Sequence, residues 1–218
     1  MIKAVIFDFD GLLADTEVIS FNVYEKILKR YGHSFSKEEY AQDYSGKTEE
    51  NNIRRLIDTY SLPLSFDECY LLEQETEKEL LEKGVRLKPG AVKLLEYLIA
   101  NRYKTAIATS STRERAMKVL REYCIHPYFW TCVFAENISH CKPDPEIFLK
   151  AAEKLGEDPE NCLVLEDSEA GIQAAFNAGM KVICIPDMKR PDDVFLEKCL
   201  AIKDTLDEVI NVLEDPIV

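Results

Sequence analysis

Residues 2–11 of this chain are Ile-Lys-Ala-Val-Ile-Phe-Asp-Phe-Asp-Gly, and the fold prediction starts from them. Its apolar run, Ile2–Phe9, is short and rich in isoleucine, valine and phenylalanine, which is typical of a strand buried on both faces of a parallel sheet. Asp10 and Gly11 then form a turn signal. The stretch therefore predicts a first buried strand that stops where two aspartates, Asp8 and Asp10, are placed.

Similar apolar runs recur along the chain, at residues 105–108, 132–134, 162–165 and 181–185. Helical segments with start and stop signals lie between them. One helix is expected to begin at a capping box, Ser111–Glu114. A second begins at Asp144-Pro145 and ends at Gly156, and a third begins at Ser168 and ends at Gly179. Strands that alternate with helices of this length predict βαβ units. We therefore expect an α/β fold with a Rossmann-like parallel sheet and right-handed crossovers.

One segment, residues 16–83, interrupts this alternation. It contains only helical periodicity, with capping boxes at Ser36–Glu39 and Ser65–Glu68. Its charge run from Glu73 to Glu82 predicts a solvated helix face. We expect an α/β core formed by residues 1–15 and 84–218, with an inserted all-α domain of four-helix type at 16–83.

Composition limits the possible partners. The 218 residues include 27 Lys+Arg and 40 Asp+Glu, which gives a net charge of −13. A chain this acidic lacks the basic face that binding to nucleic acid or to an anionic membrane requires, so we expect neither partner. Seven cysteines, an odd number without a CxxC pair, predict free thiols and a cytoplasmic protein. The first residues contain no long apolar segment of a signal peptide.

Polar residues follow several of the predicted strands. Asp8 and Asp10 end the first strand, Thr109-Ser110-Ser111 ends the second, and Glu166-Asp167-Ser168 ends the fourth. Lys142 lies before the helix that follows the third strand. In an open α/β sheet these ends lie along one edge, where ligands bind. Each motif by itself is typical of a turn or a helix cap. Together they crowd carboxylates whose repulsion a divalent cation relieves, and oxygen ligands without histidine favour Mg²⁺.

The order and spacing of these motifs resemble the haloacid-dehalogenase (HAD) superfamily, specifically its β-phosphoglucomutase-like branch. Asp8-Phe-Asp10-Gly11-Leu-Leu-Ala-Asp-Thr-Glu is similar to the first motif of the superfamily, and Thr109 to the second. Lys142 in Cys-Lys-Pro-Asp-Pro resembles the third motif and Glu166-Asp167 the fourth. The resemblance covers nearly the whole chain. It implies that the helical insert is a cap domain that closes over the catalytic core and selects the substrate.

The resemblance also implies roles for individual residues. Asp8 is the expected nucleophile that forms an aspartyl-phosphate, and Asp10 the expected general acid and base. The superfamily's dehalogenases lack this second acid, so Asp10 favours phosphoryl transfer. The implied Mg²⁺ ligands are Asp8, the Asp10 backbone carbonyl, Glu166 and Asp167. The implied substrate and phosphate ligands are Gly11, Thr109, Ser110, Lys142 and Lys47.

The cap loop at residues 44–49 is the expected specificity loop. β-Phosphoglucomutases, which this loop resembles, place an arginine at the position that aligns with Glu49, where it grips the second phosphate of a bisphosphate. A carboxylate there would repel that phosphate. Ser20 stands where many relatives place a histidine. Both differences disfavour a mutase. Lys47 has two interpretations, a contact to a distal anionic group of the substrate or a solvated loop lysine.

Three functions follow from these observations. The first is a Mg²⁺-dependent phosphatase that hydrolyses a small phosphomonoester, such as a sugar or other metabolite phosphate, and acts as a monomer. The alternative is a sugar phosphomutase of the β-phosphoglucomutase type. A third function, from another class, is a phosphorylated signalling receiver or an inactive binding protein. The position of Lys142 before Glu166-Asp167 and the large insert disfavour a receiver.

Overall fold

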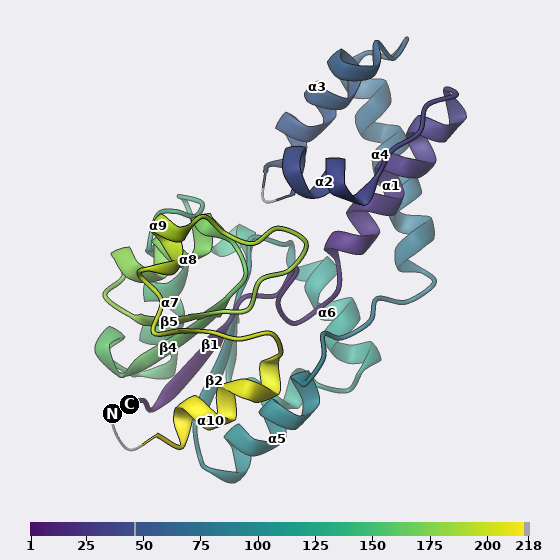
Figure 1. Cartoon of the computed structure of the whole chain (residues 1–218). Helices are drawn as coiled ribbons and strands as arrows, with labels where there is room; N and C mark the ends of the chain where they lie inside the picture. The colour runs from purple at the N-terminus through teal and green to yellow at the C-terminus, as the bar shows by residue number, and fades with distance from the viewer. Residues whose placement is uncertain (46, 216–218) are drawn as a thin grey trace. The chain divides into compact units, whose positions relative to one another are not determined.

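The computed structural model describes residues 1–45 and 47–215, which form two compact units (Figure 1). The first unit combines Met1–Ala14 with Leu87–Val218, and the second is Asp15–Arg86. Within the described residues, no helix combines the length and the apolar character that crossing a membrane requires.

The first unit contains a six-stranded sheet whose strands are all parallel. The strands are β1 (Ala4–Phe7), β2 (Lys104–Ala108), β3 (Thr131–Val133), β4 (Cys162–Glu166), β5 (Lys181–Cys184) and β6 (Ala201–Ile202). Their order is β3-β2-β1-β4-β5-β6, so the chain first extends the sheet on one side of β1 and then on the other. In open α/β sheets, ligands bind beside such a reversal at the carboxyl ends of the strands, which here are β1 and its neighbours. The predicted α/β fold with a Rossmann-like parallel sheet is confirmed.

Both faces of the sheet are buried. Alternate residues of each strand point to opposite faces, so each strand contributes side chains to the core on both sides. One face consists of Ala4 and Ile6 of β1 with their neighbours on β2, β4 and β5, and α7 and α8 pack on it. On the other face, Phe7 lies edge to face against Phe129, with ring centroids 5.7 Å apart. Burial on both sides explains the nearly continuous apolar runs of these strands.

Helices connect the strands of this unit. They are α5 (Ala91–Ala100), α6 (Arg113–Glu122), α7 (Glu146–Leu155), α8 (Glu169–Asn177), α9 (Asp193–Leu196) and α10 (Val209–Leu213). Short 3₁₀ helices are η1 (His126–Tyr128), η2 (Ala135–Asn137), η3 (Pro159–Asn161) and η4 (Leu206–Glu208). Gly156 ends α7 in the left-handed conformation, and Ser168 caps α8 through the Gly171 N–H, both as predicted. The sequence did not reveal β6, because two residues give no periodicity.

The predicted capping box at Ser111–Glu114 is wrong. Thr112 is the N-cap of α6, and its hydroxyl accepts a hydrogen bond from the Arg115 N–H. The helix therefore begins one residue later than the pattern suggested. Ser111 is left outside the helix, where its hydroxyl is available for a different contact.

The second unit is helical, as the insert was predicted to be. Its helices are α1 (Glu17–Arg30), α2 (Lys37–Asp43), α3 (Glu49–Tyr60) and α4 (Phe66–Leu81). Ser36 caps α2, and Ser65 forms a complete capping box with Glu68 at the start of α4. An aromatic core holds α1 and α2 together. Its rings belong to Phe21, Tyr24, Phe35, Tyr40 and Tyr44.

The expectation that the charge run from Glu73 to Glu82 is solvated is wrong at Glu73. Its side chain is buried among the helices of the second unit, and burial raises its pKa to about 9. Glu49 adds to this rise, because the two carboxyl groups share a hydrogen bond. The charge run therefore contains one residue that is held inside the unit in its protonated form at neutral pH.

Candidate active site

Three neighbouring strands place polar residues at one edge of the sheet. Asp8 directly follows β1, Thr109 directly follows β2, and Glu166 is the last residue of β4. The strands run in register, with Phe7 of β1 paired to Ile107 on one side and to Leu165 on the other. Parallel pairing without a shift therefore places Asp8 and Glu166 at the same level of the sheet, with Thr109 one residue beyond it.

Lys142 joins two of the carboxylates. Its Nζ atom donates hydrogen bonds to Asp8 Oδ1 at 2.5 Å and to Glu166 Oε1 at 2.6 Å. The side chains of Lys142, Asp8 and Glu166 are 8%, 9% and 1% exposed, so the group is nearly dry. The ammonium also lies 4.8 Å from the centroid of the Phe148 ring, a cation–π distance. A buried cation held by two carboxylates has a fixed position.

The electrostatics of Asp8 reflect this crowding. Burial raises the pKa of Asp8 to about 7, Lys142 opposes the rise, and the charges of Glu166 and Asp10 add to it. Burial alone would lower the pKa of Lys142, but Asp8 and Glu166 raise it above its ordinary value. Lys142 is therefore charged at neutral pH, whereas Asp8 needs a further positive charge nearby to remain fully ionised.

Glu166 is held in place by the backbone that follows it. Its Oε2 atom accepts hydrogen bonds from the N–H groups of Asp167 and Ser168, both at 2.8 Å, and from the Ser168 hydroxyl at 2.9 Å. Gly171, in the first turn of α8, leaves the space for this carboxylate. A Cβ atom on Gly171 would lie 1.7 Å from Glu166 Oε1. The glycine of the Ser-Glu-Ala-Gly motif is thus required by the position of the Glu166 side chain.

Asp8, Glu166 and Asp167 form a group that can hold a metal ion. Each offers a carboxylate oxygen, and these atoms lie within 4.8 Å of one another. The donor set consists of oxygen alone, which suits a hard divalent cation rather than zinc or copper. The charge balance fits as well, because the group brings together three carboxylates, and the one charge of Lys142 contacts Asp8 and Glu166.

Asp10 is held by the residues that follow β2. Its Oδ2 atom accepts hydrogen bonds from Ser111 Oγ at 2.6 Å and from Thr109 Oγ1 at 3.3 Å, while Oδ1 lies 3.4 Å from Arg115 Nη2. Sequence reasoning missed Ser111, which it assigned to a helix cap, and Arg115. No sequence signal identified either contact, because Ser111 lies before α6 and both residues meet a partner that is distant in sequence.

The other predicted site residues have different environments. Gly11 adopts a φ of +79°, and a Cβ atom there would lie 2.5 Å from Asp167 Oδ2 and 3.2 Å from Asp187 Oδ2. Ser110 is exposed at the end of β2. Lys47 belongs to the second unit, where its exposed ammonium donates to the Asp43 carbonyl oxygen at 2.6 Å. The contacts thus join Lys142 to Asp8 and Glu166, and Asp10 to Thr109, within the first unit, whereas Lys47 belongs to the second unit.

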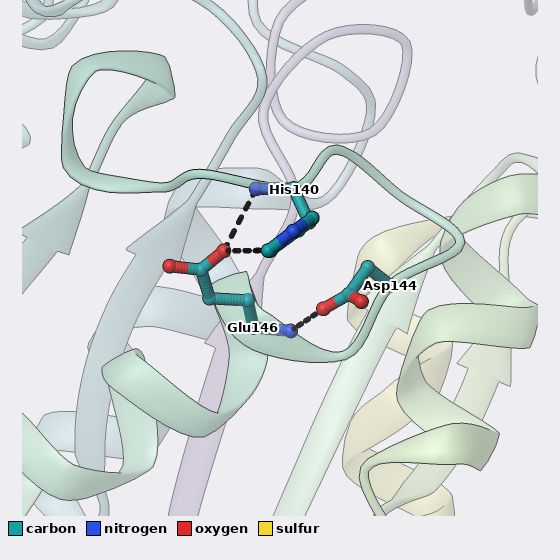
Figure 2. A group of neighbouring side chains, drawn as sticks. All are labelled: His140, Asp144 and Glu146. Carbon is teal, nitrogen blue, oxygen red and sulfur yellow. Dashed lines mark hydrogen bonds and ion pairs between the residues drawn. The ribbon is translucent and has the colours of Figure 1, made fainter.

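A second set of potential ligands, His140, Asp144 and Glu146, lies on the loop before α7 and at the first residue of that helix (Figure 2). Glu146 Oε2 accepts hydrogen bonds from the Ser139 and His140 N–H groups at 2.9 and 2.8 Å, and Asp144 Oδ1 accepts one from the Glu146 N–H. Lys150 and these N–H groups lower the pKa of Glu146 to about 2. The Glu146 carboxylate is therefore engaged in bracing the loop. Because this loop carries Lys142, the bracing also restrains the ammonium in the candidate site.

The close packing of Gly171 against Glu166 yields a stability prediction. An alanine in place of a helical glycine ordinarily stabilises a protein by about 1 kcal/mol. We expect Gly171→Ala instead to destabilise the protein by about 1–3 kcal/mol, because the Glu166 carboxylate must move. Urea unfolding measures this. In a Glu166→Ala background, which removes the obstructing carboxylate, the same change should no longer destabilise. A stabilising Gly171→Ala in the wild-type chain would contradict the described position of Glu166.

Comparison with known proteins places this geometry in a family. The sequence model described as haloacid dehalogenase-like hydrolase matches residues 5–185. A phosphorylated carbohydrates phosphatase of Thermotoga maritima is 30% identical over 98% of this chain and 99% of its own length. A (DL)-glycerol-3-phosphatase of Arabidopsis thaliana is 31% identical over 98% and 88%. The solved structure of CbbY from Rhodobacter sphaeroides in complex with phosphate superposes with a TM-score of 0.78, at 25% identity over 96% of both chains. The chain is a member of the haloacid dehalogenase-like hydrolase family.

Proposed function

We propose that this protein is a phosphatase that hydrolyses a small phosphomonoester, a sugar or other metabolite phosphate, through an aspartyl-phosphate on Asp8. One observation carries the proposal. Asp8 is a buried carboxylate at a strand end, hydrogen-bonded to the equally buried Lys142 and adjacent to a group of metal-binding oxygens. Membership of the family and the phosphatase names of its relatives support it.

The reaction divides into two displacements at phosphorus. In the first, an Asp8 oxygen forms a bond to phosphorus while the bond to the substrate's ester oxygen breaks, and Asp10 donates a proton to that oxygen. In the second, water attacks phosphorus, Asp10 takes up the water's proton, and Asp8 leaves as a carboxylate. Asp10 thus returns to its starting state. The Ser111 hydroxyl, 2.6 Å from Asp10 Oδ2, orients the Asp10 side chain for both steps.

Positive charge around the phosphoryl group must come from local sources, because the net charge of −13 repels an anionic substrate at long range. Lys142 supplies a full charge at the nucleophile. Thr109 Oγ1 and the Ser110 N–H supply donors at the end of β2, where the phosphoryl oxygens are expected. These groups act on the transferred phosphoryl group and are therefore expected to serve every substrate equally.

Mg²⁺ is the proposed cofactor. The residues that would hold it are Asp8, Glu166 and Asp167, together with the backbone carbonyl of Asp10. When bound, it supplies positive charge that keeps Asp8 ionised and neutralises phosphoryl oxygens. The raised pKa of Asp8 in the protein alone supports this requirement.

The two units have separate proposed roles. The first, Met1–Ala14 with Leu87–Val218, is the proposed catalytic core, and the second, Asp15–Arg86, is the proposed cap that selects the substrate and excludes water. Of the proposed specificity loop at 44–49, Gly46 lies outside the described residues, and Lys47 remains a candidate contact for a distal anionic group. We further propose a monomer that works in the cytoplasm. The seven free cysteines support a reducing compartment.

The role of Asp8 is tested by replacing its nucleophilic oxygen. Asp8→Asn should reduce turnover of p-nitrophenyl phosphate in the presence of Mg²⁺ by about 10³-fold or more, because an amide does not form the phosphoenzyme. Asp158→Asn makes the same chemical change at an exposed position before β4 and should leave turnover unchanged. Wild-type turnover in Asp8→Asn would overturn the site assignment and favour a non-enzymatic binding protein.

The dependence on a divalent cation is tested by chelation. Binding of inorganic phosphate, measured by calorimetry, should disappear in EDTA and return with excess Mg²⁺, because the buried carboxylates otherwise repel the anion. EDTA already saturated with Mg²⁺ serves as the control for the chelator itself. Phosphate binding of equal strength in EDTA would show that Lys142 and the donors of Thr109 and Ser110 suffice without a metal ion.

Phosphatase and mutase activity differ in the fate of the aspartyl-phosphate. Hydrolysis should release one phosphate per hexose 1-phosphate consumed, without isomerised sugar phosphate, and both products are quantified together. Glu49 is the reason for this expectation: it stands where the mutases place a phosphate-binding arginine, and it instead accepts a hydrogen bond from Gln74 at 2.6 Å. Isomerisation without phosphate release, with a hexose bisphosphate as primer, would establish the mutase.

A further inference from the structure

Lys88 and Asp187 form an ion pair that the reaction described above does not use. Lys88 Nζ lies 2.5 Å from Asp187 Oδ1, and the side chains are only 16% and 10% exposed. Both residues belong to the first unit, although 99 positions separate them in sequence. A pair so well shielded from solvent exerts a stronger electrostatic effect on its surroundings than the exposed ion pairs of the surface.

The pair adjoins the group of carboxylates through Gly11. A Cβ atom on Gly11 would lie 2.5 Å from Asp167 Oδ2 and 3.2 Å from Asp187 Oδ2, so both carboxylates approach the same side of Gly11. Asp167 is one of the three residues whose oxygens gather within 4.8 Å. Asp187 follows β5 and is absent from that group. It therefore supplies a fourth negative charge beside the metal-binding oxygens without being one of the ligands.

The position of Lys88 is fixed by the backbone. Its N–H donates to the Leu13 carbonyl oxygen at 2.9 Å, and the preceding residue, Leu87, forms a bridge with Ala14. This is the segment where the chain returns to the first unit after residues 15–86. The backbone of Lys88 is thus anchored to Leu13 and Ala14, next to the turn that contains Asp10 and Gly11.

We propose that the Lys88–Asp187 pair sets the affinity of the Asp8–Glu166–Asp167 site for its divalent cation. The Asp187 carboxylate attracts the cation from outside the ligand set, and Lys88 holds that carboxylate in place while offsetting part of its charge. The inference rests on the proposed metal site and deepens it, since it assigns the tuning of that site to two residues that touch neither substrate nor metal. Asp187 and Lys88 are positioning residues in this sense.

The two partners are predicted to act in opposite directions. Asp187→Asn removes the negative charge and leaves Lys88 uncompensated, so the Kd for Mg²⁺ should rise about 10-fold. Lys88→Met removes the positive charge and keeps the length of the side chain, so the Kd should fall. Calorimetric titration of the full-length protein with Mg²⁺ alone measures both changes without reference to turnover. A role in structure alone would weaken binding in both variants.

A matched pair provides the control. Lys104 and Glu157 lie 2.7 Å apart with side-chain exposures of 27% and 11%, and Lys104 begins β2 at the opposite edge of the sheet. Lys104→Met and Glu157→Gln should leave the Mg²⁺ Kd unchanged.

The outcomes separate this inference from the proposed function. Mg²⁺ binding by the wild type that is lost in Asp167→Asn establishes the metal site itself, and its absence in the wild type would overturn the site and the inference together. If the wild type binds Mg²⁺ and Asp187→Asn binds it within twofold of the same Kd, the inference alone fails. A Lys88→Met variant that binds Mg²⁺ more weakly than the wild type would also overturn it.

Discussion

The repulsion among buried carboxylates is the constraint on which the site depends. Asp8, Glu166 and Asp167 meet at one edge of the sheet with oxygens within 4.8 Å of one another, and Asp10 lies two residues beyond Asp8. Such a group is stable only with positive charge among its members. Lys142 supplies one charge through two short hydrogen bonds. The loop braced by Glu146 and the space left by Gly171 hold the two ends of this interaction in place.

The distribution of charge therefore matters more than its sum. A protein of net charge −13 does not attract phosphate esters from a distance. Its candidate site must first offset the charge of its own carboxylates, and Lys142 together with the proposed divalent cation would supply the positive charge that does so. The same positive charges also favour the reaction, because they stabilise the negative charge that develops on the oxygen atoms during phosphoryl transfer.

Errors at the sequence level share one cause. Ser111 was assigned to a helix cap because its hydroxyl and Glu114 fit the capping pattern, yet Thr112 caps α6 and Ser111 donates to Asp10. Glu73 was assigned to a solvated face, although it is buried beside Glu49. In both cases the local pattern was consistent with a solvent-exposed or capping side chain and also with a side chain that contacts a distant segment. The tertiary contact distinguished the two.

The sequence by itself determined the fold class and the edge of the sheet that carries the chemistry. The apolar runs reveal parallel strands because burial on both faces removes the polar alternation, and the residues after those strands must then share one edge. The tertiary structure alone decided which side chains meet. Lys142 contacts Asp8 across 134 positions, and Lys88 contacts Asp187 across 99. Such pairs depend on the strand order and on the path of each loop, which local periodicity does not encode. A charged residue in a loop is equally compatible with solvent exposure and with an ion pair to a distant residue, so the local sequence does not distinguish the two.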